Sequence, residues 1–529
     1  MTRKFPVWLI PLLSILTFGL TGLALIPYPG LQNDELFFAG PIYADLAFYK
    51  LQFGAAKVPL MVMSYTGALK TWLYMALFQV LAPDEWSVRV PVLLMGMATV
   101  WLSWVLVRRL AGDRAANVTA ILLATDTIFL MTNTFDWGPV ALQHILLMAG
   151  LVAIQSWVAG GSRRMLALGF FLWGLGAWDK ALMAWPLIGL AVATVVVYPR
   201  ELKARLRLKP LGLAVLAFLI GASPLVWFNL DRAGETATAN TRFTAEGLGT
   251  KLRAAEDTVN GSTLFGYMVY TSAPAAGHAQ GTILGKVAAR IGRVFGNHRK
   301  NGMIPAYALG LICFVICLRS PRRRILLFLL ITTAVAWAQM ALTKGTGGAS
   351  HHVILLWPFP VMFLGIALSE AAARARYGAA ALIAVTVILA GTNLLTTNEY
   401  LREFDANGGF GGWTDAIYRL AGSVEKGPSV SWIGLVDWGY LNALETFHEG
   451  DLPLFIVADG NRAEIKREIE APESIFIQHT EDKQMFPGIN DRLRDMAGQL
   501  GFEEHVERTV HDRNGRPVFE LFRFVKPAR

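Results

Sequence analysis

The residues of this sequence best suited to chemistry are acids and bases set among apolar neighbours. Two adjacent acids stand in LQNDELFFAG (31–40), and further charged or titratable residues stand in NTFDWGPV (133–140), GAWDKALMAWP (176–186) and TKGTGGASHHVILLWPFP (343–360). Such side chains act as general acids and bases or stabilise developing charge. Each of these residues lies next to a long hydrophobic run. They are Asp34, Glu35, Asp136, Asp179, Lys180, Lys344, His351 and His352.

The elements that must position these residues are apolar helices. Of the 529 residues, 54% are hydrophobic and 16% are charged, and the mean hydropathy is +0.43; this is too apolar for a soluble protein. The run 6–26 can cross a hydrocarbon core of about 30 Å, and no cleavage site follows it. We therefore expect a polytopic α-helical membrane protein with about eleven transmembrane helices, in the runs 6–26, 87–107, 115–133, 137–159, 165–178, 181–198, 211–229, 302–318, 325–342, 353–369 and 378–396. The short pair 165–178 and 181–198 is also compatible with a re-entrant hairpin.

Lys and Arg gather at every second junction between these runs. The basic positions are Arg3, Lys4, Arg108, Arg109, Arg114, Arg163, Arg164, the segments 199–210 and 319–324, Arg374 and Arg376. This alternation predicts a cytoplasmic N-terminus. The net charge of +9 then reflects topology, and nothing predicts nucleic-acid binding. Cys313 and Cys317 share one apolar run, which predicts buried packing rather than a disulfide or a metal site.

The candidate residues all fall on the opposite, extracytoplasmic side. Ionisable groups at a membrane boundary are costly unless they meet water or each other, so they commonly line a polar cavity. Simple solvation of helix ends is the competing interpretation, which suits residues such as Lys70 and Asp84. For Asp34 and Asp136 we favour the interpretation that they line a cavity, because their neighbours are aromatic and apolar. For Asp126, inside an apolar run, a functional role and hydrogen bonding to neighbouring threonines stay equally open.

The first external loop (27–86) contains a further apolar segment, 58–83. A crossing here would invert every later loop, so we expect an amphipathic helix lying in the membrane interface. Lys70 would lie on its polar side, with Trp72 and Tyr74 at headgroup level.

The order of these features resembles the GT-C glycosyltransferases over residues 5–400. The resemblance rests on an acid soon after the first helix, a P-L…Y…K run in the first loop, the Arg-Pro pair of SVRVPVLL (87–94), a second Asp before the fourth helix, and GLGAWDK (174–180). The branch it resembles contains the protein O-mannosyltransferases and lipid A aminoarabinose transferases. Where relatives often have a basic-Pro-Pro segment, this chain has AAKVPLMV (55–62), which puts the equivalence of Lys57 in doubt.

The resemblance implies transfer of a sugar from a polyprenyl-phosphate donor to an acceptor hydroxyl, on the extracytoplasmic side of a bacterial inner membrane. We expect Asp34 to be the base. Asn33 would cap a helix that starts here, and Glu35, the second catalytic candidate of the pair, would serve the N-terminus of that helix. Asp136 would orient the acceptor or stabilise charge on the sugar ring. The residues expected to bind substrate, above all the leaving phosphate, are Lys57, Lys70, Asp179, Lys180, Lys344, His351 and His352.

A catalytic metal is not expected from this resemblance, so no cofactor is predicted. Asp34, Glu35 and Asp136 offer the oxygen ligands that a divalent ion needs. The second loop, however, lacks the Asp-x-Asp that would support such a site.

The chain turns polar after about residue 400, which predicts a separate extracytoplasmic α/β domain (400–529) after the transmembrane domain (1–399) with its long external loop (230–301). Strands are expected in 429–440, 451–460 and 473–480, helices in 462–471 and 489–502, and a hairpin in 505–525. Asp437 and His479 follow strands, where α/β folds place ligands, although solvated loop positions are the simpler interpretation.

Two other functions share these features. A transporter or flippase of a lipid-linked sugar would also have many helices, but the chain shows no internal repeat and its polar groups crowd one side. A ligase that joins a whole glycan to another lipid would use the same leaving group. The expected partners are the lipid-linked donor, membrane lipid, and an acceptor that is a lipid, a glycan or a protein.

Overall fold

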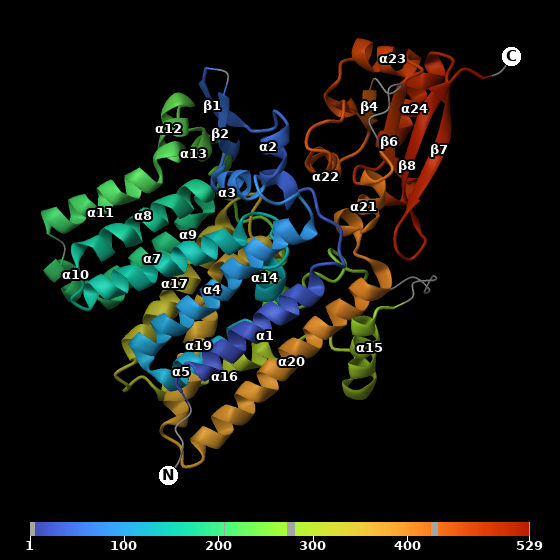
Figure 1. The fold of residues 1–529 in the computed structure, drawn as a ribbon. Helices are drawn as coiled ribbons and strands as arrows, with labels where there is room; N and C mark the ends of the chain where they lie inside the picture. Colours follow the sequence, from blue (N-terminus) through green and yellow to red (C-terminus); the bar gives the residue numbers. More distant parts are fainter. Residues whose placement is uncertain (1–5, 55, 206, 272–280, 425–431, 528–529) are drawn as a thin grey trace.

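A bundle of long helices capped at one end by a smaller α/β unit makes up the protein (Figure 1). The computed structural model describes residues 6–54, 56–205, 207–271, 281–424 and 432–527. Each of the eleven expected apolar runs contains at least one helix of the bundle, and the run 115–133 is divided between two, α5 and α6. These helices are α1 (Leu9–Leu25), α4 (Glu85–Ala111), α5 (Asp113–Thr125), α6 (Thr127–Thr132), α7 (Val140–Val158), α8 (Arg163–Asp179), α9 (Ala184–Val197), α11 (Leu208–Gly221), α16 (Met303–Ile316), α17 (Arg323–Leu342), α19 (Phe359–Ala372) and α20 (Gly378–Asn407).

The helices are long and apolar enough for a membrane protein. Among the described residues, α4, α7, α17 and α20 could each cross a membrane, and up to seven spans result if three bent helix pairs each count as one. The bent pairs are 181–197 with 199–205, 208–221 with 223–231, and 350–356 with 359–372. The expected number of eleven is not confirmed. One reason is length, because helices such as α1, with 17 residues, lie at the lower limit for a span.

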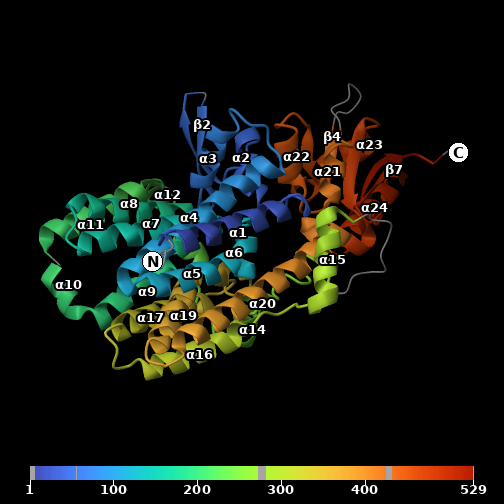
Figure 2. The same cartoon turned by 60° about the horizontal axis from the view of Figure 1, so that its bottom comes forward.

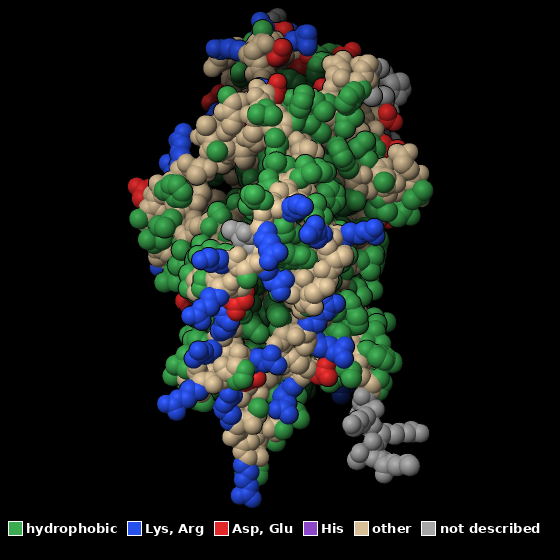
Figure 3. Space-filling model, turned by 90° about the vertical axis from the view of Figure 1, so that its left-hand side faces the viewer, with side chains coloured by type: hydrophobic (Ala, Val, Ile, Leu, Met, Phe, Trp, Pro, Cys, Tyr) green, Lys and Arg blue, Asp and Glu red, His purple; other side chains and the backbone are tan. Residues whose placement is uncertain are grey.

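One end of the bundle is basic. The junctions that the sequence assigns to one side contact each other there: Arg109 donates to Gln155 Oε1 (3.0 Å), Arg205 to the Val158 carbonyl (2.8 Å) and Arg324 to the Val197 carbonyl (2.7 Å). Lys and Arg side chains gather at this end in the surface view (Figure 3). The basic junctions that the sequence assigns to one side therefore lie together at one end of the bundle, while Arg3 and Lys4 lie outside the described residues.

The first external loop lies at the other end and is partly β-structure. It contains η1 (Leu36–Phe38), α2 (Gly40–Tyr43), the three-stranded sheet β1 (Tyr49–Phe53), β2 (Ala56–Met63) and β3 (Thr66–Gly67), and α3 (Leu69–Leu77). The helix expected over 58–83 is wrong in its first part, where Val58 pairs with Leu51 of β1. A continuous apolar run fits a buried strand as well as a helix, and its periodicity cannot separate the two.

The C-terminal unit is built on a five-stranded sheet of order β5-β4-β6-β8-β7. Strands β4 (Trp432–Leu435), β5 (Leu454–Ile456) and β6 (Ser474–His479) are parallel, while β7 (Glu503–His511) and β8 (Pro517–Val525) add an antiparallel hairpin. Helices α21 (Ala416–Ala421), α22 (Leu441–Phe447), α23 (Arg462–Glu470) and α24 (Ile489–Gln499) complete the unit. The elements expected after residue 450 are confirmed; of the first expected strand, 429–431 lie outside the described residues.

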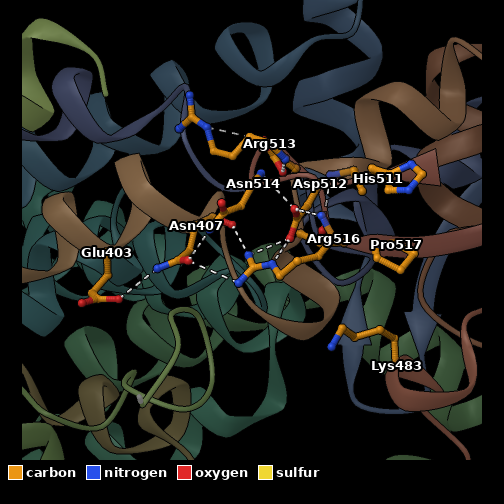
Figure 4. Close-up of polar contacts among 12 residues, drawn as sticks. Glu403, Asn407, Lys483, His511, Asp512, Arg513, Asn514, Arg516 and Pro517 are labelled. Carbon is orange, nitrogen blue, oxygen red and sulfur yellow. Dashed lines mark hydrogen bonds and ion pairs between the residues drawn. The ribbon is translucent and has the colours of Figure 1, made fainter. Parts of the chain in front are cut away.

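The C-terminal sheet is attached to the end of α20, which runs unbroken through the proposed boundary at residue 400. The turn between β7 and β8 reaches back to Asn407 (Figure 4). Arg516 donates to Asn407 Oδ1 (3.2 Å) and to its carbonyl (3.0 Å), and Asn514 donates to Oδ1 (3.1 Å). A second attachment is visible in Figure 2, where α22 lies beside α2 of the first loop.

Candidate active site

The segment that carries Asp34 is held by residues of the C-terminal unit. Gly30 N–H donates to the Trp413 carbonyl (2.7 Å). The backbone N–H of Asn442 donates to Asn33 Oδ1 (3.3 Å), and the Asn442 side-chain amide donates to the Asn33 carbonyl (3.2 Å). Asn33 therefore caps no helix, contrary to the prediction, because η1 begins without a side-chain cap and Asn33 joins this loop to α22 instead.

Asp34 is half-buried and lies close to Lys180. Its own backbone N–H donates to Gln32 Oε1 (2.5 Å). Burial raises the pKa of the Asp34 carboxyl by more than the Gln32 side chain, the Lys180 ammonium and the Asn33 side chain lower it. No ion pair of Asp34 is recorded within the described part of the chain. A carboxylate that is poised in this way, with no fixed counter-ion, suits a general base.

Glu35 points elsewhere and forms a buried ion pair with Arg89 of α4. Arg89 Nε lies 3.0 Å from Glu35 Oε1 and Nη2 lies 2.7 Å from Oε2, and both side chains are at most 1% exposed. Arg89 also donates to the carbonyls of Ile26, Pro29 and Gly30. Glu35 thus fixes the corner between α1 and the loop, which leaves Asp34 as the acid available for chemistry.

Asp136 is likewise engaged, with Lys70 of α3. Lys70 Nζ lies 3.0 Å from Asp136 Oδ2, and both residues are buried. Asp136 Oδ1 accepts from the Val140 N–H (2.6 Å) at the start of α7. The expectation that Lys70 lies on a solvated helix face is therefore wrong, because α3 turns this side chain inward over the Phe38 ring. The pair ties the first loop to the second.

Lys180 is a buried cation whose ammonium makes no ion pair or hydrogen bond in the described residues; its Nζ lies 6.0 Å from the centroid of the Tyr65 ring. It is 4% exposed and follows α8, where Ala181 N–H donates to the Tyr65 carbonyl (2.9 Å). Gly138 leaves room for it: a Cβ at Gly138 would lie 3.0 Å from Lys180 Nζ and 3.9 Å from His351 Cδ2. Lys180 and His351 therefore flank the same glycine. A buried ammonium without an anion is costly, so this position suits an anionic ligand.

The neighbouring polar groups are also incompletely paired. His351 Nδ1 accepts from Trp137 Nε1 (2.9 Å), and the His351 and His352 rings lie 4.2 Å apart. His352 Nδ1 and Asp179 Oδ1 are buried without a hydrogen-bond partner in the described part of the structure. The other Asp179 oxygen accepts from Gln143 (2.9 Å). Unsatisfied buried polar groups commonly mark a ligand site.

Comparisons with known proteins agree with this architecture. Residues 66–228 match the family model of dolichyl-phosphate-mannose-protein mannosyltransferases. ArnT from Cupriavidus metallidurans bound to undecaprenyl phosphate aligns over 97% of both chains with 15% identity and a TM-score of 0.60, and its apo state gives 0.61. The Archaeoglobus fulgidus oligosaccharyltransferase in complex with Zn and sulfate aligns over 92% of this chain and 69% of its own, with 11% identity and a TM-score of 0.52. The fold is that of the GT-C glycosyltransferases. A search of curated proteins finds no match.

Not all expected residues reach the site of this GT-C fold. Lys57 is 55% exposed and pairs with Asp45 (3.1 Å). Lys344 is exposed, and its backbone N–H donates to the Arg242 carbonyl (2.7 Å). Asp126 caps α6 and accepts a hydrogen bond from Trp357 Nε1 (3.0 Å). Its buried carboxylate is therefore hydrogen-bonded within the fold, although not by the neighbouring threonines.

Several important residues escaped the sequence analysis. Arg89 stands in the SVRVPVLL motif, but nothing in the sequence pairs it with Glu35. Lys251 of α14 (Leu248–Val259) is buried and donates to the carbonyls of Ala341 (2.7 Å) and Thr343 (2.8 Å), which holds the loop that leads to the two histidines. Both are buried cations in amphipathic or apolar segments. That placement is the one sequence feature that could have drawn attention to them.

Asp437 and His479 are not the solvated loop residues expected from the sequence. Both are buried, and His479 Nδ1 lies 2.8 Å from Asp437 Oδ2. Burial alone would raise the pKa of the Asp437 carboxyl, but hydrogen bonds from His479 and from two backbone N–H groups hold that pKa below its usual value. The pair joins the ends of the neighbouring parallel strands β4 and β6.

The carboxylates offered as a metal site do not come together. Glu35 is committed to Arg89 and Asp136 to Lys70. Within the described ranges, no group of three His, Cys, Asp or Glu side chains has an arrangement that could hold a metal ion. Cys313 and Cys317 are free and buried, as the sequence predicts.

Proposed function

We propose that this protein transfers a sugar from a polyprenyl-phosphate donor to an acceptor hydroxyl at the extracytoplasmic membrane face. The observation that carries the proposal is the position of two groups at one end of the bundle. The half-buried acid Asp34 lies close to the buried cation Lys180, and neither forms an ion pair within the described residues. Support comes from the GT-C fold and from the undecaprenyl phosphate bound to the similar ArnT.

The acid supplies the base. In the proposed reaction the acceptor oxygen forms a bond to the anomeric carbon, its proton passes to Asp34, and the bond between that carbon and the phosphate oxygen breaks. A hydroxyl is a weak nucleophile, so a carboxylate within hydrogen-bond reach lowers the barrier. The Glu35–Arg89 pair and the Asn33–Asn442 contact orient the segment on which this base stands.

The cation stabilises the leaving group. Negative charge grows on the lipid phosphate as it departs, and a preorganised cation in a water-poor site stabilises that charge. Lys180 is the first candidate, and His351 is positioned to donate a hydrogen bond beside it across Gly138. Lys70 and Asp136 contribute by holding the Gly138 turn against the first loop.

The test is transfer of radiolabelled sugar to membranes of the source cells from polyprenyl-phosphate mannose and polyprenyl-phosphate aminoarabinose. Asp34→Asn keeps the shape of the side chain and removes its basicity, so turnover should fall by about 10² or more while donor binding is retained. Asp45→Asn, an exposed acid of the same loop, is the matched control. Normal turnover by Asp34→Asn would refute the assignment of the base.

A second pair of variants tests the donor site. Lys180→Ala should weaken binding of the purified protein to the active donor, because the phosphate loses its buried counter-ion. Lys300→Ala removes a 63% exposed lysine and should leave binding unchanged. Equal binding by both variants would show that Lys180 has no part in donor recognition. Movement of the donor across vesicle membranes without any transfer would favour a flippase instead.

A further inference from the structure

A cavity of about 290 Å³ lies between the Asp34 loop and the C-terminal sheet. Asn33 forms one wall, and the segments that follow β4 and β5 form the others, with Phe486 and Ile489 at the side. Asn33 is the residue directly before Asp34. The cavity is therefore adjacent in the chain to the proposed base and lies outside the helical bundle.

The position follows from the topology of the sheet. The chain passes from β4 to β5 on one side and then crosses back to β6 on the other side of β4. This reversal leaves a crevice at the carboxyl end of β4, the place where open α/β sheets bind ligands. Asp437 connects the segments around this crevice, because its carboxylate accepts hydrogen bonds from the N–H groups of Trp438 (2.8 Å) and Met485 (2.7 Å) and from His479.

The lining defines the class of ligand. Among the described residues, its polar side chains are Asn33, Asp437 and Asp459, and no Lys or Arg lines it. Two large aromatic side chains are left partly open, Trp438 at 37% and Phe486 at 57% exposed. A pocket with apolar rings and a few fixed hydrogen-bonding groups suits a sugar ring, which has an apolar C–H face and hydroxyl edges. The carboxylates would repel a phosphate.

We propose that this cavity binds the acceptor, as an uncharged sugar residue of a glycan, and presents one of its hydroxyls to Asp34. The inference rests on the proposed function and deepens it by naming the acceptor class and its site. The Asn33–Asn442 contact then has a second role: it fixes the wall shared by the cavity and the base.

Filling the cavity tests its role whatever the identity of the acceptor glycan. Ala458 is an exposed lining residue, so Ala458→Cys can be alkylated with a bulky maleimide in the purified full-length protein. Transfer to source-cell membranes should fall at least tenfold after alkylation, while donor binding is unchanged. Lys466→Cys, exposed on α23 outside the cavity, is the matched control and should keep its activity, as should the wild type treated with the same reagent.

A second variant covers the case in which the cysteine itself disturbs folding. Trp438→Ala removes one aromatic wall and should raise the KM for acceptor membranes by about tenfold, the scale of one well-packed contact, with little change in kcat or donor binding. A fall in kcat at unchanged KM would contradict the proposal. So would full transfer by the alkylated Ala458→Cys protein.

The product tests the acceptor class. Linkage analysis should find the label attached to a neutral sugar residue. Release of labelled monosaccharide by β-elimination, which indicates attachment to Ser or Thr, or by mild acid, which indicates a glycosyl phosphate, would overturn the inference. If the wild type neither binds nor transfers either donor sugar, the proposed function itself fails, which these outcomes distinguish from failure of the cavity alone.

Discussion

The Glu35–Arg89 pair is the contact whose loss should destabilise the site most. Both side chains are at most 1% exposed, and Arg89 is held in place by three backbone carbonyls as well as by Glu35. In Glu35→Gln the guanidinium stays buried without its counter-ion. Breaking one partner of a buried pair costs about 3–5 kcal/mol. Because the amide keeps one acceptor oxygen, we expect about 3 kcal/mol, or a fall of roughly 10²-fold in the ratio of folded to unfolded protein.

The measurement is the free energy of unfolding in mixed micelles with increasing SDS, followed by tryptophan fluorescence. Glu201→Gln is the matched control, because Glu201 also forms a two-contact pair with Arg324 (2.6 and 2.9 Å) but both partners are more than 40% exposed. Solvent screens that pair, so its loss should matter little. Equal destabilisation by the two substitutions would refute the argument that burial, rather than pairing itself, sets the size of the effect.

Three further predictions follow from the site. Since burial raises the pKa of the Asp34 carboxyl above 3.8, turnover should be lost as pH falls through a pKa above that of a solvated Asp; a pH–rate profile that stays flat down to pH 4 would contradict this. Gly138→Ala should weaken donor binding, because a Cβ meets Lys180 Nζ at 3.0 Å and the glycine has φ +121°, whereas Gly160→Ala, at φ +101° with open space around it, should leave binding intact. Lys466→Cys should react with an impermeant maleimide in intact cells, and reaction only after lysis would reverse the proposed topology.

The pattern of the sequence determined the class of protein and much of its local structure. Long apolar runs and alternating basic junctions predict the helical bundle and its two ends, because hydropathy and charge act on each segment separately. The periodicity of the sequence also predicts the strands and helices after residue 450. It does not predict the pairing of β1 with β2, since the run 58–63 becomes a strand only because Tyr49–Phe53 lies beside it.

The sequence indicates which residue types form the candidate site, but it does not indicate which of these residues pair with each other. Asp34 and Glu35 are adjacent in the sequence and look equivalent there. Only the fold pairs Glu35 with Arg89, 54 residues away, and leaves Asp34 without an ion pair among the residues that the structure describes. In the same way the fold exposes Lys344 and buries Lys70, although both are lysines beside apolar runs. The cavity beside Asn33 depends on residues more than 400 positions later in the chain. Burial and pairing are set by what packs against a side chain, and those neighbours are brought together by the tertiary structure rather than by spacing along the sequence.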